Sequence, residues 1–355
     1  MSKSYLFWVD VSHFLAQIGF FSSAILGSIL ISLNIFEIKQ MFGTYKYLIN
    51  TFTTLGIAFA LVEAIVYPNL HSYNAGYCFF TTWKPFNLNK EVMLIGVALY
   101  SALYASTISL LAVQFIYRYW SIFDQLKMKY FQGHKCLIWF AYCLFFAIEW
   151  ASGIYHFSKA DTVSTEYFRI EILDRYGAQI DNVPMFAMVA YDPKDGSVRW
   201  WNLMTTVNVT GVMGIQYGVI VYCGWSMYSR MGEKVLNLST FLKRHHAQLF
   251  KTLILQITVP TITLFFPLTL IIYLPLLNWE VSIPSGIVMC GFTLYPAMDA
   301  LIVMSVVTEY RVAIRKIFES FLKRVIHKCS QRYSVNPSSD RPLRTFNSIA
   351  VASSN

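Results

Sequence analysis

Three carboxyl side chains stand inside long apolar stretches of the sequence, where charged residues are costly. They are Glu63, Glu149 and Asp299. A carboxyl group in such a stretch either serves function, as a ligand contact or part of an ion path, or stays neutral or paired and links neighbouring helices. The residue types alone leave both interpretations open.

Patterns typical of catalysis are absent from the sequence. It contains no Gly-x-Ser-x-Gly, no His-Glu-x-x-His and no Gly-rich phosphate loop. The adjacent His245 and His246 cannot both point to one face of a helix, and Cys136 and Cys143 are seven residues apart. We therefore expect no enzymatic activity, no bound metal and no cofactor.

The composition excludes an ordinary soluble protein. Of the 355 residues, 56% are hydrophobic and 13% are charged, whereas soluble domains carry about 25% charged residues. The mean hydropathy is +0.47, and an aromatic content of 17% excludes a disordered chain. The class that remains is a polytopic membrane protein. The net charge of +9 then indicates basic cytoplasmic loops beside the lipid bilayer, and no nucleic acid as partner.

Seven stretches are long and apolar enough to cross a bilayer core about 30 Å thick, which needs about 20 helical residues. They cover residues 11–36, 47–68, 92–117, 136–156, 203–228, 252–277 and 285–307. The sequence therefore predicts an all-α membrane protein, built as a bundle of seven transmembrane helices.

The distribution of basic residues predicts the orientation of this bundle. If the N-terminus lies outside, 20 Lys and Arg residues fall in inner segments and 8 in outer segments. The positive-inside rule then places the N-terminus outside and the C-terminus inside. In this orientation Glu63 and Glu149 lie in the outer halves of their spans, and Asp299 lies in the inner half.

Two further segments follow the seventh span. Residues 309–327 place apolar side chains at helical spacing among Lys and Arg, which predicts an amphipathic helix on the inner membrane surface. This helix is the last element of a predicted membrane domain of residues 1–333. Residues 334–355 are rich in Ser, Pro and Asn, and predict a disordered cytoplasmic tail.

The longest outer connector, residues 157–202, suggests a structured lid. Asp192-Pro193-Lys194-Asp195-Gly196 separates two apolar and aromatic runs, 183–191 and 197–201, which predicts a β-hairpin. Residues 166–176 predict one or two helical turns. A lid would cover aromatic side chains of this connector such as Trp200 and Trp201. The alternative is a solvated linker.

Several local motifs resemble one family of membrane proteins. The run Ser109–Trp120, the entry Tyr45–Ile49 to the second span, and the segments Leu253–Pro260, Tyr295–Met304 and Glu309–Arg311 resemble the nematode serpentine chemoreceptors of the Str superfamily, the diacetyl-receptor-like group. The resemblance covers roughly residues 10–325. It implies a seven-transmembrane receptor in the plasma membrane of sensory cilia, which binds a small-molecule chemical ligand and activates a heterotrimeric G protein.

The same resemblance suggests roles for individual residues. Arg118 takes the place of the arginine in the Asp-Arg-Tyr motif of rhodopsin-like receptors, but Tyr117 stands where that motif has its acid. Tyr295-Pro296-x-x-Asp299 occupies the place of the Asn-Pro-x-x-Tyr segment. Cys78 is the one outer cysteine, so the usual outer disulfide is not expected.

We therefore assign candidate sites in three groups. For G-protein coupling they are Arg118, Tyr117, Tyr119, Lys243, Arg244 and Arg311; for a pocket that binds a neutral ligand they are Glu63, Glu149, Tyr100 and Tyr104; for a conformational switch they are Pro260, Tyr295, Pro296 and Asp299. The alternative function is an ion-coupled transporter or ligand-gated channel that uses the three intramembrane carboxyl groups. Transporters usually contain paired repeats, and no convincing repeat relates the halves of this chain.

Overall fold

The computed structural model describes residues 4–37, 44–85, 88–235 and 254–334. The chain forms two compact units, which divide after Tyr310. The first unit is a helical bundle with a small β-sheet, and the second consists of most of helix α10 (Thr308–Ser334). Helix α10 contains the predicted helix 309–327; its place on a membrane surface stays a prediction.

Seven helices of the described chain are long and apolar enough to cross a membrane, and each overlaps one predicted span. The helices are α1 (Leu6–Ser32) with its π-helical extension Leu33–Glu37, α2 (Tyr45–Val66), α3 (Lys90–Phe123), α4 (Leu137–Phe157), α6 (Trp200–Val235), the sixth span Ile254–Leu277 with α8 (Phe266–Tyr273) inside it, and α9 (Gly286–Val306). The predicted seven-helix bundle is confirmed.

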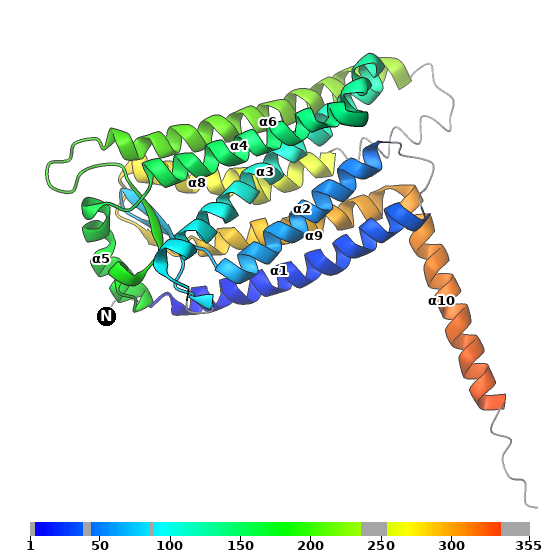
Figure 1. Ribbon diagram of the computed structural model, residues 1–355, viewed down its shortest axis with the longest axis horizontal. Helices are drawn as coiled ribbons and strands as arrows, with labels where there is room; N and C mark the ends of the chain where they lie inside the picture. The colour runs from blue at the N-terminus through cyan, green and yellow to red at the C-terminus, as the bar shows by residue number, and fades with distance from the viewer. Residues whose placement is uncertain (1–3, 38–43, 86–87, 236–253, 335–355) are drawn as a thin grey trace, which may run out of the picture. The chain divides into compact units, whose positions relative to one another are not determined.

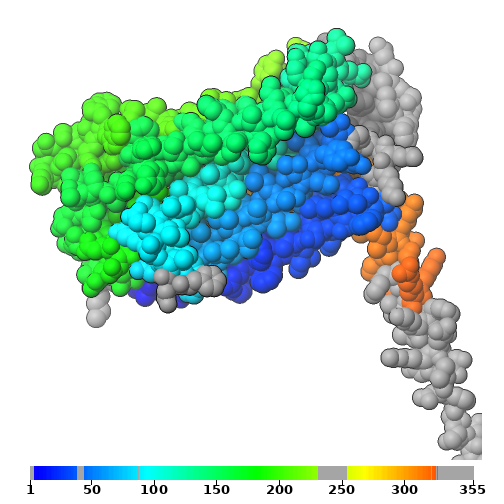
Figure 2. Space-filling model, in the orientation of Figure 1, coloured from blue at the N-terminus to red at the C-terminus, as the bar shows by residue number. Residues whose placement is uncertain are grey.

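Helix α3 occupies the centre of the bundle. It packs against α2, α4 and α6, while α1 packs against α2 and α9 (Figure 1). Its small residues Ser101, Ala105 and Ser109 are buried, which lets neighbouring helices approach closely. The side chains of α1, α2 and α3 lie side by side along the face drawn in Figure 2, with α4 above them. Residues on α3 therefore reach the interior at every depth of the bundle.

The contact of α2 with α9 depends on a glycine. A Cβ atom at Gly56 would lie 2.7 Å from Cβ of Pro296, which is closer than real Cβ atoms approach. Glycine thus lets the backbone of α2 pack directly on the proline of α9.

A four-stranded antiparallel sheet lies at one end of the bundle, which we call the sheet end (Figure 1). The strands are β1 (Asn69–Tyr73), β2 (Gly76–Phe80), β3 (Met185–Val189) and β4 (Ser282–Ile283), in the order β3-β2-β1-β4. Asn74 has a φ of 46° in the tight connection between β1 and β2, a conformation that Asn tolerates well. The sheet therefore joins three connectors that are far apart in the sequence.

Both faces of the three long strands are buried. Along β2, Tyr77 and Phe79 pack into the core of the bundle, while Cys78 and Phe80 pack into a second core beneath α5 (Thr162–Tyr176). Helix α5 begins with a capping box between Asp161 and Ser164 and is longer than the predicted one or two turns. A register shift by one residue would exchange the two faces, so burial on both sides fixes the pairing.

The predicted hairpin between residues 183–191 and 197–201 is wrong. Strand β3 pairs with β2 instead, with Phe186 opposite Phe79 and Met188 opposite Tyr77. All five residues of β3 are buried, whereas a hairpin at the surface would leave one face exposed to solvent. Of the predicted turn, the hydrogen bond from Asp192 N to Ser197 O (2.8 Å) and one bridge from Tyr191 to Val198 are present.

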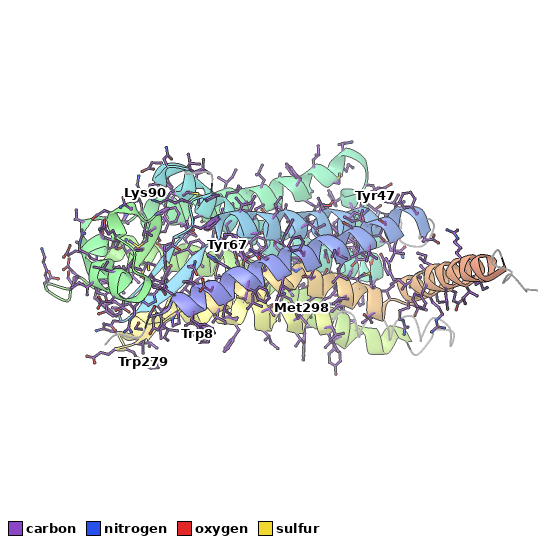
Figure 3. All side chains as sticks on the ribbon, turned by 90° about the horizontal axis from the view of Figure 1, so that it is seen from below. Trp8, Tyr47, Tyr67, Lys90, Trp279 and Met298 are labelled. Atoms are coloured by element: carbon purple, nitrogen blue, oxygen red, sulfur yellow. The ribbon has the colours of Figure 1, made fainter. Side chains whose placement is uncertain are left out.

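The expected cover over Trp200 and Trp201 is also absent in the structure. These residues begin α6, and their exposed fractions are 70% and 65%. Trp8, Trp83 and Trp279 are exposed as well, and Trp8 and Trp279 lie at the sheet end, while Tyr47 lies toward the other end (Figure 3). Tryptophan prefers the boundary between hydrocarbon and water, so an interfacial position explains this exposure better than a lid does.

Candidate functional site

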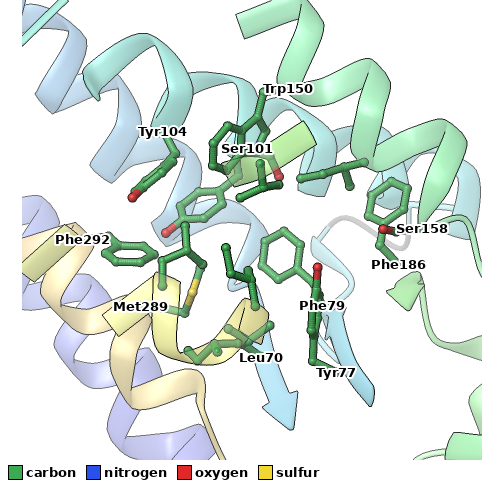
Figure 4. A pocket seen from close by; sticks show the side chains of 16 residues that line it. Leu70, Tyr77, Phe79, Ser101, Tyr104, Trp150, Ser158, Phe186, Met289 and Phe292 are labelled. Atoms are coloured by element: carbon green, nitrogen blue, oxygen red, sulfur yellow. The ribbon is translucent and has the colours of Figure 1, made fainter. Parts of the chain in front are cut away.

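An apolar cavity lies inside the bundle next to the sheet (Figure 4). Its volume is about 70 Å³. This is roughly five times what one water molecule requires, and well below the usual range of drug-sized sites, about 300–1,000 Å³. The lining side chains come from α3, α4, α6, α8, α9 and three strands: Leu70, Tyr77, Phe79, Tyr100, Ser101, Tyr104, Trp150, Ile154, Ser158, Phe186, Val209, Leu268, Ile271, Ile272, Met289 and Phe292. The cavity suits a small molecule.

Aromatic rings form the floor of the cavity. The ring of Tyr104 lies 4.9 Å from that of Phe292 and 5.4 Å from that of Trp150, between centroids. The Tyr104 hydroxyl donates to the carbonyl oxygen of Leu264 at 3.1 Å. Leu264 belongs to the π-helical turn Thr261–Phe265 that follows Pro260, so the floor is tied to the irregular part of the sixth span.

The sheet forms the roof of the cavity. Leu70 of β1, Tyr77 and Phe79 of β2, and Phe186 of β3 all face it (Figure 4). Because these side chains stand on strands that are buried on both faces, the roof is part of the packed core and not a surface loop.

Two of the predicted pocket residues line this cavity and two do not. Tyr100 and Tyr104 are in the wall. Glu63 lies behind Tyr100 and accepts hydrogen bonds from the Tyr100 hydroxyl at 3.0 Å and from the Thr293 hydroxyl. Glu149 accepts from the side-chain amide of Asn208 and so links α4 to α6. Both carboxyl groups therefore connect helices in this structure.

The predicted switch residues surround a second buried polar pair. Asp299 on α9 accepts a hydrogen bond of 3.0 Å from the amide of Gln256 on the sixth span. Tyr295 is buried one helical turn before Asp299, with its ring 6.2 Å from that of Phe52. Pro296 lies inside α9 and Pro260 precedes the π-helical turn. The role of the two prolines in a conformational switch stays a prediction.

Arg118 lies near the C-terminal end of α3, away from the sheet, and contacts Tyr45, the first residue of α2. Arg118 donates from Nε to the Tyr45 hydroxyl oxygen at 2.8 Å, and also from Nη2. The Tyr45 ring stacks on Tyr117 at 5.1 Å. Arg118 thus finds a phenol on α2 in place of the acid missing at position 117.

The structure shows fewer contacts for the other residues predicted to couple to a G protein. The hydroxyl of Tyr119 accepts a hydrogen bond of 3.4 Å from Arg230 of α6. Lys243 and Arg244 lie outside the described residues. Arg311 belongs to the second unit. The structure therefore brings together Tyr45, Tyr117 and Arg118, and the sequence motifs gave no sign that Tyr45 is the partner of Arg118.

A polar network that the sequence patterns did not reveal holds the sheet end together. The carboxylate of Glu171 on α5 accepts from Arg175 Nε at 3.0 Å and from the Ser282 hydroxyl at 2.5 Å, and lies 3.4 Å from Nε2 of His71. The Tyr176 hydroxyl lies 3.0 Å from Nδ1 of His71. The network joins β1, α5 and β4.

The charge of Glu171 is strongly favoured in this setting. Burial alone would raise the pKa of the Glu171 carboxyl, but its interactions with His71, Ser282 and Arg175 outweigh burial and lower the pKa to about 2. The carboxylate therefore stays ionised over the whole physiological pH range and keeps its partners in place.

Comparison with known proteins identifies the family. Residues 12–315 match the family model described as "Serpentine type 7TM GPCR chemoreceptor Str". The chain belongs to the Str family of serpentine chemoreceptors. The receptor is 36% identical to the G-protein coupled receptor str-33 of Caenorhabditis elegans over 87% of this chain and 91% of that protein. It is 31% identical to the serpentine receptor class r-10 of the same nematode, over 83% of this chain and 85% of that protein.

Family membership agrees with the bundle and its cavity. The receptor is a G-protein-coupled chemosensory receptor with seven membrane-spanning helices. The transporter or channel alternative is not favoured. Glu63, Glu149 and Asp299 are each engaged with a different pair of helices, as expected for links between helices.

Proposed function

We propose that the receptor binds a small neutral molecule in the cavity beneath the sheet and activates a heterotrimeric G protein at the opposite end of the bundle. The observation that carries this proposal is the apolar cavity, whose wall contains no charged residue. An ionic ligand would lose its hydration there without gaining a counter-charge. Coupling through Arg118, Tyr117 and Tyr119 follows from their place at the end of α3 away from the sheet, and Lys243, Arg244 and Arg311 remain further candidates.

The proposal includes an orientation and a location. The excess of basic residues in alternate connectors supports an outside N-terminus, a sheet end that faces the exterior and a cytoplasmic C-terminus. We place the receptor in the plasma membrane, in the cilium of chemosensory neurons.

Epitope labelling tests the orientation. A tag at residue 2 is expected to bind antibody on intact cells, and a tag at residue 355 to bind after permeabilisation, because 20 of 28 basic residues lie in the segments assigned to the cytoplasm. Cells that carry both tags and a cytosolic marker provide the permeabilisation control. The reverse labelling would place the sheet inside the cell and contradict ligand entry from the exterior.

A ligand panel with a G-protein readout tests the function. Neutral volatile compounds are expected to activate cells that express the receptor, and amino acids or sugars to have little effect, because the wall offers apolar contact area and few polar groups. Recording of ion flux in cells without G protein separates a receptor from a channel. Responses to highly charged ligands alone, or currents that need no G protein, would contradict the proposal.

A further inference from the structure

A second hollow lies between α6 and the sixth span, at the surface of the bundle. Its volume is about 310 Å³, about four times that of the cavity beneath the sheet. Helix α6 contributes Met213 and Gly214 to its wall, and the sixth span contributes Phe265, Phe266 and Ile272. Gly214 and Phe266 are exposed, whereas Ile272 is buried. We call this hollow the lateral groove.

Contacts between hydroxyl groups frame the lateral groove at two levels. The hydroxyls of Thr210 and Tyr273 lie 3.1 Å apart, and those of Tyr217 and Thr261 lie 3.3 Å apart. Along α6 the two levels are about 10 Å apart, at about 1.5 Å per residue. Between them Gly214 leaves open space, because a Cβ atom at this position would meet nothing within 4 Å outside its own stretch of helix. The two helices are therefore joined at two points and separated between them.

The polar groups in the wall of the lateral groove are paired. The wall contains no charged residue. Besides the two framing contacts, the hydroxyl of Thr261 donates to the carbonyl oxygen of Ile257 at 2.6 Å, and that of Thr269 donates to the carbonyl oxygen of Phe265 at 2.7 Å. Every hydroxyl in the wall thus has a partner within the described chain, so the groove can face hydrocarbon without an unpaired donor.

The lateral groove opens at the depth of the hydrocarbon core. Along α6, Thr210 lies about 14 Å from Trp201 and Tyr217 lies about 12 Å from Trp225, at about 1.5 Å per residue. Both tryptophans are exposed, and exposed tryptophan prefers the boundary of the hydrocarbon. Ile215, which lies next to Gly214 in α6, is exposed as well. The medium that reaches the groove is therefore lipid.

We propose that the lateral groove binds an acyl chain of a bilayer phospholipid, which fills the space between α6 and the sixth span. A flexible chain reaches this depth while its headgroup stays at the membrane surface. A sterol fits less well. Its hydroxyl is costly to bury in hydrocarbon and stays near the headgroups, so its rigid rings lie closer to the membrane surface than the groove does.

An occupied groove supports the wall of the cavity beneath the sheet from behind. Ile272 lines both the groove and the cavity. Phe265, also in the groove wall, belongs to the π-helical turn in which the carbonyl of Leu264 accepts a hydrogen bond from Tyr104 of the cavity. The acyl chain therefore contacts the part of the sixth span that shapes the cavity, although it does not enter the cavity itself.

The test labels the chain where it lies. Full-length receptor is placed in nanodiscs of palmitoyl-oleoyl phosphatidylcholine with a small share of a phosphatidylcholine that carries a diazirine in the middle of one acyl chain. After photolysis, mass spectrometry of peptides compares labelling of residues 261–273 with labelling of α1. Helix α1 packs against α2 and α9 and exposes apolar side chains to the same lipid, so it is the internal reference.

Two leucine variants are matched. Gly214→Leu fills the groove, since a helical side chain points back toward the N-terminus of its helix and thus toward Thr210. Gly211→Leu is the control. Gly211 is also exposed and has open space around it, but it does not line the groove.

Residues 261–273 of the wild-type receptor are expected to be labelled more strongly than α1, because a bound chain stays longer than a chain on an open helix surface. The leucine of Gly214→Leu displaces at least one methylene group of the chain, so this labelling should fall about fourfold relative to α1. Gly211→Leu should preserve it. If Gly214→Leu does not fold, the ratio in the wild-type receptor decides.

Equal labelling of 261–273 and α1 in the wild-type receptor, or equal labelling of 261–273 in the two leucine variants, would overturn the inference. Nanodiscs that also contain cholesterol separate the two kinds of lipid. Labelling that persists supports an acyl chain, and labelling lost at 261–273 but kept on α1 would assign the groove to a sterol. Because no ligand of the cavity and no G protein is used, failure of this inference leaves the proposed function standing.

Discussion

Arg118→Lys is expected to lower ligand-evoked G-protein signalling by at least about tenfold while ligand binding persists. Two nitrogens of the Arg118 guanidinium donate to one phenol oxygen of Tyr45. Lysine keeps the charge but not the planar fork that makes this contact. Hydrogen bonds to charged groups contribute about 1.5–3 kcal/mol, and a factor of ten corresponds to about 1.4 kcal/mol. The measurement is second-messenger output at equal surface expression, beside ligand binding on the same cells.

Arg230→Lys is the matched control. Arg230 is exposed and contacts the hydroxyl of Tyr119 at 3.4 Å, so its exchange should change signalling little. Full signalling by the Arg118→Lys variant would reduce Arg118 to a membrane anchor. Tyr45→Phe adds the complementary change: it keeps the ring on Tyr117 but removes the acceptor of Arg118. It should lower ligand-evoked signalling in the same direction as Arg118→Lys if that contact supports coupling, and unchanged signalling would show that it does not.

Glu171→Gln is expected to destabilise the sheet end by up to about 3 kcal/mol, which corresponds to the lowering of its pKa at about 1.4 kcal/mol for each pH unit. The side chain of Glu171 is 10% exposed, and Arg175 would lose its ionic partner. The melting temperature of the purified receptor at pH 7 should fall by about 5 °C. Glu166→Gln on the same helix is the control, because the Glu166 side chain is 73% exposed and its ion pair with Arg169 lies at the surface.

The pH dependence of this difference has a defined sign. The pKa of Glu171 is lowered from 4.5 to about 2 in the folded receptor. Its contribution is therefore present above pH 4.5, and it declines as the pH falls from 4.5 toward 2. The melting temperatures of the wild-type receptor and Glu171→Gln should converge across this interval. A constant difference over the whole interval would show that the effect of the substitution does not arise from the charge.

The helices of this receptor could be predicted from the sequence because each span is a long, continuous apolar segment, a signal that depends on neighbouring residues alone. Tyr100 and Tyr104, which were predicted as pocket residues, both line the cavity, since residues four apart along a buried helix return to the same face. The intramembrane position of Glu63 was also evident from its apolar neighbours. Its partners were not, since Thr293 lies 230 residues further along the chain.

The sheet could not be predicted in the same way. Its three long strands have five residues each, and burial on both faces removes the alternation of polar and apolar residues that usually reveals a strand. The sequence around β3 therefore suggested a hairpin with the segment that follows it. Its real partner is β2, more than 100 residues away in the sequence. Tyr77 was missed for the same reason, because its connector gave no sign that it becomes the roof of the cavity.

The way in which the sheet end is held together has a practical consequence for redox conditions. Cys78, in the middle of β2, is a free thiol buried between the sheet and α5. Backbone pairing among three connectors and the Glu171 network hold this end together. In many cell-surface proteins a disulfide bond has this role. Reducing agents have no bond to break there. The sheet end is therefore expected to keep its structure in dithiothreitol, and this part of the architecture needs no oxidative maturation.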